Sequence, residues 1–202
     1  MGSDHPFALY RILISRFFAL AFLLLVIFTE SAQEQSLVSD FLFLLGLLLV
    51  SAATAGRLWC AVYINGYKNR ELVVHGPYSI SRNPLYFFSL IGFVGVGFAT
   101  ETWTIPLAAL VAFALFYPQV IRKEERFLKS FFGPAFDEYS ARTPRFFPDF
   151  RLFREPESYV IDTKRFRQSI CDVLWFLWLV GLIELTEALH RHDIIRPLFR
   201  LP

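Results

Sequence analysis

The sequence predicts an all-α integral membrane protein, a helical bundle with about five transmembrane helices. Of its 202 residues, 55% are hydrophobic and 19% are charged, which is more apolar than the core of one soluble domain requires. The apolar residues also occur in long runs, and about 20 such residues cross the roughly 30 Å hydrocarbon layer as a helix. Because lipid offers no hydrogen bonds to the backbone, we expect these runs to be helices and not open strands.

Five apolar runs define the expected helices. They cover residues 9–28, 41–56, 83–100, 102–121 and 173–183. The first run is long and no small-residue cleavage site follows Phe28, so it is expected to be a retained helix and not a cleaved signal peptide. The last run is short and bounded by Asp172 and Glu184, so it either spans the membrane or lies partly in the interface. Of these two placements, spanning is favoured.

The positions of lysine and arginine predict the orientation. These residues gather at the amino-terminal end, between the second and third runs, and after the fourth run, whereas the loops 29–40 and 100–104 are acidic and contain neither. By the positive-inside rule the basic side is cytoplasmic. Arg191, Arg196 and Arg200 oppose this rule if the last run crosses. The expected location is an inner membrane, bacterial in the favoured interpretation, or an endomembrane.

The charges, cysteines and histidines favour neither a nucleic-acid partner nor a metal site. The net charge is +2, and the basic residues lie beside apolar runs and among acids, where anionic lipid headgroups explain them. Cys60 and Cys171 have no disulfide or metal-ligand spacing. His190 and His192 are two residues apart and would point to different faces of a helix.

One domain is expected over residues 1–202, since no linker or repeat divides the chain. Its successive parts are a first helical hairpin, a hairpin flanked by polar motifs, and a cytoplasmic segment with the last helix, in residues 1–63, 64–148 and 149–202. Gly133-Pro134 is expected to end a helix that begins near Val120, and a short helix is expected over residues 135–141.

Two polar motifs flank the hairpin formed by the third and fourth runs. They are Arg70–Tyr86 (RELVVHGPYSISRNPLY) and Glu124–Pro148 (EERFLKSFFGPAFDEYSARTPRFFP). Both ends of a hairpin lie on the same side of the membrane, so the motifs can face each other across one site. There Arg82 could hold a carboxylate in a two-pronged geometry, and Glu124 could attract a cation or accept hydrogen bonds from hydroxyl groups.

Each of these residues also has an ordinary interpretation. Glu124 and Glu125 could belong to a solvated helix end, and Arg82 could be a cytoplasmic membrane anchor. Tyr78 and Tyr86 could belong to the aromatic belt at the membrane interface. The order and spacing of the whole set favour a shared site over these separate roles.

The order and spacing of the motif residues also point to a known family. The residues are Gly76-Pro77-Tyr78, Arg82-Asn83-Pro84-Leu85-Tyr86, Glu124-Glu125, Phe132-Gly133, Tyr139 and Thr143-Pro144. This set, within roughly residues 56–148, resembles the isoprenylcysteine carboxyl methyltransferases, and the related phospholipid N-methyltransferases share the arrangement. The resemblance implies a membrane methyltransferase that uses S-adenosyl-L-methionine, held at the cytoplasmic ends of the helices.

The resemblance further implies the roles of individual residues. The cofactor-binding residues would be Arg70, Glu71, Leu72, Val73, Tyr78, Asn83, Pro84, Leu85, Tyr86 and Glu124. The catalytic residues would be Arg82, Glu124 and Arg122. In the prenylcysteine enzymes a basic residue shortly before the paired glutamates contacts the methyl acceptor; the same spacing reaches Val120 here, and Arg122 could serve instead. Many family members have histidine at the position of Asn83. Histidine titrates near neutral pH but asparagine does not, so no proton transfer is expected at this position.

Three functions fit these observations. The favoured one is carboxyl O-methylation of a lipophilic, prenylcysteine-like acceptor that enters from the bilayer. The second is N-methylation of an amine phospholipid headgroup, and the third is a non-catalytic membrane scaffold or lipid-binding protein. The expected partners are a lipophilic or lipidated substrate and membrane lipids, and no nucleic acid.

Overall fold

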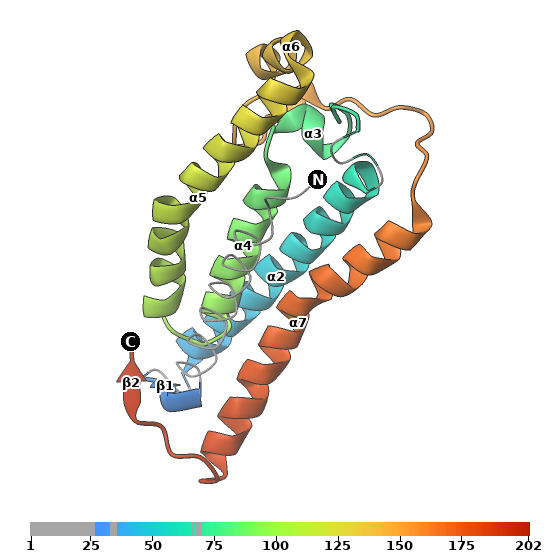
Figure 1. The fold of residues 1–202 in the computed structure, drawn as a ribbon. Coiled ribbons are helices and arrows are strands. Elements are labelled where there is room, and N and C mark those ends of the chain that lie inside the picture. Colours follow the sequence, from blue (N-terminus) through green and yellow to red (C-terminus); the bar gives the residue numbers. More distant parts are fainter. Residues whose placement is uncertain (1–26, 33–35, 66, 68–69) are drawn as a thin grey trace, which may run out of the picture.

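The computed structural model describes residues 27–32, 36–65, 67 and 70–202 (Figure 1). Within this part of the chain, helices run along one another over most of the molecule and short elements cover both ends, which confirms the predicted helical bundle. The expected first helix, residues 9–28, lies almost wholly outside the described residues.

The long helices have the dimensions of membrane spans. α2 (Leu37–Ile64), α5 (Thr104–Phe132) and α7 (Thr163–Arg191) are each long and apolar enough to cross a bilayer. With 28 or 29 residues, each measures roughly 42–44 Å along its axis. α4 (Pro84–Phe98) is as apolar but has 15 residues, or about 22 Å.

The helix boundaries follow local signals in the sequence. α2 begins at a reciprocal cap, in which Ser36 Oγ accepts from the Ser39 N–H (3.1 Å) while Ser39 Oγ accepts from the Ser36 N–H (3.3 Å). Gly133, at a φ of +53°, separates α5 from α6 (Pro134–Arg142), which confirms the predicted short helix. The predicted helix start near Val120 is wrong, because α5 continues without a break from Thr104. The sequence changes from apolar to charged near Arg122, but such a change of polarity does not end a helix.

The core is built by close contact between α2 and α4. A Cβ atom added to Gly46 would lie 2.5 Å from the Ala99 nitrogen, and one added to Gly95 would lie 2.8 Å from the Val50 nitrogen. Small residues at such a crossing let two backbones approach closely, as in other membrane helix pairs. α7 completes the cluster of buried residues, which are Val50, Val96, Ala99, Phe176, Val180 and Ile183.

The segment after α7 closes the end of the bundle at the bottom of Figure 1. β2 (Phe199–Leu201) pairs in parallel with β1 (Thr29–Ser31), a short sheet that the all-helical prediction did not include. Arg200 Nε lies 3.1 Å from Glu30 Oε2, so a basic residue of the tail pairs with an acid of the first loop. This pair offsets part of the positive charge that opposes the positive-inside rule at this end.

Candidate active site

A cavity of about 360 Å³ lies at the opposite end of the bundle, where the end of α2, the start of α4, the second half of α5 and the first half of α7 meet. This volume falls in the range of sites that bind small organic ligands. The lining residues are Arg57, Ala61, Ile64, Asn65, Glu71, Leu72, Val73, Tyr78, Arg82, Asn83, Pro84, Leu85, Tyr86, Glu124, Leu128, Tyr139, Ser169, Asp172 and Val173.

Most of the residues expected in a site meet in this cavity. Nine of the ten expected cofactor-binding residues line it: Glu71, Leu72, Val73, Tyr78, Asn83, Pro84, Leu85, Tyr86 and Glu124. The tenth, Arg70, is exposed and is not in the lining. Of the three expected catalytic residues, Arg82 and Glu124 line the cavity, whereas Arg122 is exposed on α5. Residues two apart on a helix do not share a face, so Arg122 and Glu124 point in different directions.

Backbone hydrogen bonds hold the two polar motifs together. The Arg82 N–H donates to the Pro144 carbonyl (2.8 Å), and the Asp149 N–H donates to the Ile80 carbonyl (2.9 Å). From α6, the Tyr139 hydroxyl donates to the Tyr78 carbonyl in α3 (Pro77–Ile80) at 2.7 Å. The chain after α6 therefore fixes the short α3 segment against the cavity.

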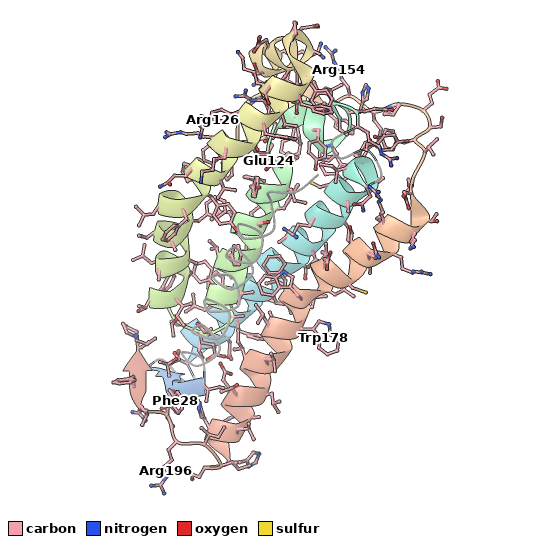
Figure 2. All side chains as sticks on the ribbon, viewed as in Figure 1. Phe28, Glu124, Arg126, Arg154, Trp178 and Arg196 are labelled. Atoms are coloured by element: carbon pink, nitrogen blue, oxygen red, sulfur yellow. The ribbon has the colours of Figure 1, made fainter. Side chains whose placement is uncertain are left out.

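The paired glutamates have different surroundings. Glu124, labelled in Figure 2, lines the cavity. Its Oε2 accepts a hydrogen bond from the Tyr86 hydroxyl at 2.6 Å. Among the described residues, Glu124 Oε1 has no hydrogen-bond partner, so it is available to a ligand. Glu125 is buried and forms ion pairs with Arg82 (Nε to Oε1, 3.5 Å) and with Arg145. Glu124 thus faces a ligand space, while Glu125 joins the two motifs.

Asn83 forms hydrogen bonds to the second polar motif that could not be predicted from the sequence. Its Nδ2 donates to Glu125 Oε1 (3.2 Å) and to the Arg145 carbonyl (2.8 Å), and the residue precedes the first turn of α4. An amide can make both bonds at once without a change of charge. Asn83 therefore links the start of α4 to the second polar motif.

Three buried donors in the lining have no hydrogen-bond partner among the described residues. They are Arg57 Nε, the Tyr78 hydroxyl and Arg82 Nε. Of the three, Arg82 Nε has an ion-pair partner, Glu125 Oε1 at 3.5 Å, whereas Arg57 Nε and the Tyr78 hydroxyl have neither kind of partner among the described residues. Burial raises the pKa of Tyr78 well above its ordinary value, so its hydroxyl remains neutral and able to donate. Since buried polar groups are almost always satisfied in proteins, their concentration here indicates a ligand.

α2 and α7 contribute lining residues that the sequence motifs did not predict. From α2, the cavity takes Arg57, Ala61, Ile64 and Asn65, which follow the i, i+4, i+7, i+8 spacing of one helix face. Asn65 Nδ2 donates to Ser169 Oγ on α7 (3.0 Å) and joins the two helices at the rim. The polar residues at this spacing in an apolar helix were the signal that could have identified the face.

The chain matches a known family over half its length. Residues 35–135 match the profile of the phospholipid methyltransferase family, and this range includes α2, the first polar motif, α4 and α5. The chain belongs to the phospholipid methyltransferase family. It is therefore related to membrane methyltransferases, as the resemblance of its two motifs predicted.

Some relatives of this phospholipid methyltransferase family member are named as metal resistance proteins, and others as isoprenylcysteine methyltransferases. The cobalt-zinc-cadmium resistance protein CzcN of Cupriavidus metallidurans is 43% identical over 98% of this chain and 88% of its own length. The nickel-cobalt-cadmium resistance protein NccN of Alcaligenes xylosoxydans xylosoxydans is 40% identical over 98% of this chain and 89% of its own. Protein-S-isoprenylcysteine O-methyltransferase B of Arabidopsis thaliana is 33% identical over 67% of this chain and 76% of its own. No solved structure matches the chain.

Within residues 27–32, 36–65, 67 and 70–202, no group of three or more histidine, cysteine, aspartate or glutamate side chains is arranged to hold a metal ion.

Proposed function

We propose that this protein transfers the methyl group of S-adenosyl-L-methionine to the carboxylate of a lipophilic, prenylcysteine-like acceptor. The observation that supports this most is the single cavity lined by nine of the ten residues expected to bind the cofactor. These residues come from both polar motifs, which are separated in the sequence by a helical hairpin. The plant isoprenylcysteine methyltransferase relative supports the same reaction class.

The side chains present suit this cofactor. S-adenosyl-L-methionine, when bound, supplies a methyl group on a positively charged sulfur. Glu124 Oε1 can accept from ribose hydroxyls or offset the positive charge, and the Tyr78 hydroxyl can donate. Leu72, Val73 and Leu85 supply apolar walls that exclude water. Together these groups can bind, orient and shield a charged nucleoside.

Methylation of a carboxylate requires little acid–base chemistry. A carboxylic acid is already ionised at neutral pH, so no proton must leave during the transfer. The residues then mainly need to align donor and acceptor, a task that accounts for large rate enhancements by itself. Asn83 in place of the family's histidine is compatible with this reaction, because no titrating group is needed at its position.

N-methylation of a phospholipid amine is the second candidate, and the family profile favours it. An amine headgroup is protonated at neutral pH and must lose a proton before it can attack a methyl group. Glu71, Glu124 and Asp172 are the carboxylates of the lining that could accept such a proton. The two candidates differ in their products, because an ester is cleaved by base and an N-methylamine is not.

We propose that the cavity faces the cytoplasm of a bacterial inner membrane. The basic residues Arg122, Lys123, Arg126 and Lys129 lie at the cavity end of α5, whereas Glu30 and Glu101 lie at the other end of the bundle. The positive-inside rule then directs the cavity to the cytoplasm, where S-adenosyl-L-methionine is made. The relatives from Cupriavidus and Alcaligenes support a bacterial membrane.

The test is transfer of labelled methyl from S-adenosyl-L-methionine into extracted host membranes by the purified protein. Glu124→Ala is expected to reduce transfer at least 100-fold, since it removes the free acceptor atom of the cavity. Glu138→Ala, on the exposed face of α6, is the matched control and should retain activity. Release of the label by mild base identifies an ester, and its retention identifies the amine reaction.

A protein that neither transfers methyl groups nor binds S-adenosyl-L-methionine would contradict the proposal. That result would support the third function, a non-catalytic membrane scaffold or lipid-binding protein. In that case, Glu124→Ala would change stability or assembly alone.

A further inference from the structure

Arg57 is a cation in the cavity to which the proposed reaction assigns no role. It lies on α2, a helix that is apolar enough to cross the membrane. Its Nη1 donates to Ser89 Oγ on α4, and its guanidinium carbon lies 5.6 Å from the centroid of the Phe176 ring on α7. Three helices therefore hold this guanidinium in place.

Arg57 has no carboxylate partner in the described part of the chain. Its Nε is buried and unbonded, and none of the ion pairs among the described residues includes it. Asp172 lines the same cavity and attracts Arg57 electrostatically, but its side chain is exposed and forms neither a hydrogen bond nor an ion pair with Arg57. Arg82, by contrast, is paired with Glu125. Because an unpaired charge inside a membrane helix is costly, such residues most often serve a ligand.

The position of Arg57 indicates which ligand it serves. On the cavity-facing side of α2 it lies eight residues, or about 12 Å along the axis, deeper in the bundle than Asn65. The expected cofactor strip, residues 71–73, follows the end of α2 in the chain and lines the same cavity, with Val73 packed against the cluster of Cys60, Tyr63 and Tyr78. A lipophilic acceptor that enters from the bilayer would present its head at the deeper part, beside Arg57 and Ser89.

We infer that Arg57 binds the carboxylate of the methyl acceptor through its unpaired Nε and so selects an anionic head over a neutral one. This inference rests on the proposed function, because it assigns the acceptor contact in the same cavity. A carboxylate at Arg57 would balance the buried charge and could accept two parallel hydrogen bonds from the guanidinium.

The chemistry of the transfer balances with this assignment. A carboxylate oxygen forms a bond to the methyl carbon while the carbon–sulfur bond breaks, and the bonding electron pair remains on sulfur. The sulfonium becomes a neutral thioether, the carboxylate becomes a neutral methyl ester, and no proton is exchanged. The product loses its charge attraction to Arg57, which favours its release.

The test measures binding without turnover, with purified full-length protein in lipid nanodiscs. The probes are N-acetyl-S-farnesylcysteine and its carboxamide, which differ in the charge of the head. The wild type is expected to bind the acid about 10- to 100-fold more tightly than the amide, as charge-assisted hydrogen bonds predict. Arg57→Gln should bind both probes equally, and Arg57→Lys should retain part of the preference.

Two controls separate this effect from misfolding and from loss of cofactor binding. Arg126→Gln removes an arginine that points away from the bundle (Figure 2) and should leave the preference for the acid unchanged. The affinity for S-adenosyl-L-methionine, titrated separately, should stay within about twofold in all variants. Retained cofactor affinity in Arg57→Gln would also demonstrate that this variant is folded.

Three results would overturn the inference. The first is a preference for the acid that survives Arg57→Gln, and the second is a wild type that binds neither probe. The third is a loss of cofactor affinity in Arg57→Gln with unchanged binding of the acid, which would assign Arg57 to the carboxylate of the methyl donor. If Arg57→Gln removes the preference but the wild type transfers no methyl group, the carboxylate site stands and the proposed reaction fails.

Discussion

The two ends of the bundle are built from similar polar residues but satisfy them differently. At the end with the short sheet, Ser31 Oγ donates to the Glu101 carbonyl (2.8 Å), Thr100 Oγ1 donates to the Gly97 carbonyl (2.7 Å), and the pocket there measures about 30 Å³. At the other end the cavity is about 360 Å³, and two buried donors of its lining, Arg57 Nε and the Tyr78 hydroxyl, have neither a hydrogen-bond partner nor an ion-pair partner among the described residues.

This difference distinguishes an end whose polar groups bond to protein from an end that contains the candidate active site. A pocket of about 30 Å³ holds little more than a water molecule, and polar groups of its lining such as the Ser31 and Thr100 hydroxyls bond to protein. A large cavity with unpaired donors carries a free-energy cost that a bound ligand would remove. The state of pairing, more than the number of polar residues, therefore indicates where a ligand binds.

The largest expected effect on stability comes from Glu125→Ala, at the cavity end. This substitution leaves Arg82 without its carboxylate and removes a bond from Asn83, so the free energy of unfolding should fall by about 3 kcal/mol. Thermal unfolding in detergent measures the change. The adjacent Glu124→Ala should lower the midpoint much less, because Glu124 bonds to Tyr86 alone among the described residues. Equal losses for the two variants would contradict their separate roles.

A pair of isosteric substitutions compares the two ends directly. Tyr78→Phe removes an unpaired hydroxyl, so stability should stay constant or rise slightly while methyl transfer falls about 10-fold. Thr100→Val breaks the bond to Gly97 and the 3.0 Å contact with Thr102 Oγ1, so stability should fall by about 1 kcal/mol with transfer unchanged. Unfolding midpoints and transfer rates of both variants test this. The contrast fails if Tyr78→Phe destabilises the protein as Thr100→Val does.

The smallest effect is expected for Arg200→Gln in the tail. This side chain is 75% exposed in its ion pair with Glu30, so its loss should change stability by at most about 0.5 kcal/mol. The backbone pairing of β1 with β2 remains, and methyl transfer should be unaffected. A large loss of transfer in this variant would mean that the two ends are coupled through α7.

Sequence patterns are sufficient to predict the bundle, the two polar motifs and most of the residues that line the cavity. Apolar runs predict membrane helices because helix length must match lipid thickness, and α5 and α7 agree with this. The motif residues Tyr78, Asn83 and Glu124 could be predicted to meet because a hairpin returns its ends to one side. The resemblance then supplied their expected roles.

The direction in which each of these side chains points, and the distant residue that it contacts, depend on how the helices pack together. Glu124 and Glu125 are neighbours in the sequence, but the rotation of α5 against its surroundings directs one to the cavity and the other to Arg82. The same rotation leaves Arg122 exposed. Arg57 joins the site only because α2 packs against α4 and α7, contacts that bring together residues 32 and 119 positions apart. Local sequence fixes the periodicity of a helix, whereas its orientation depends on packing with segments far along the chain.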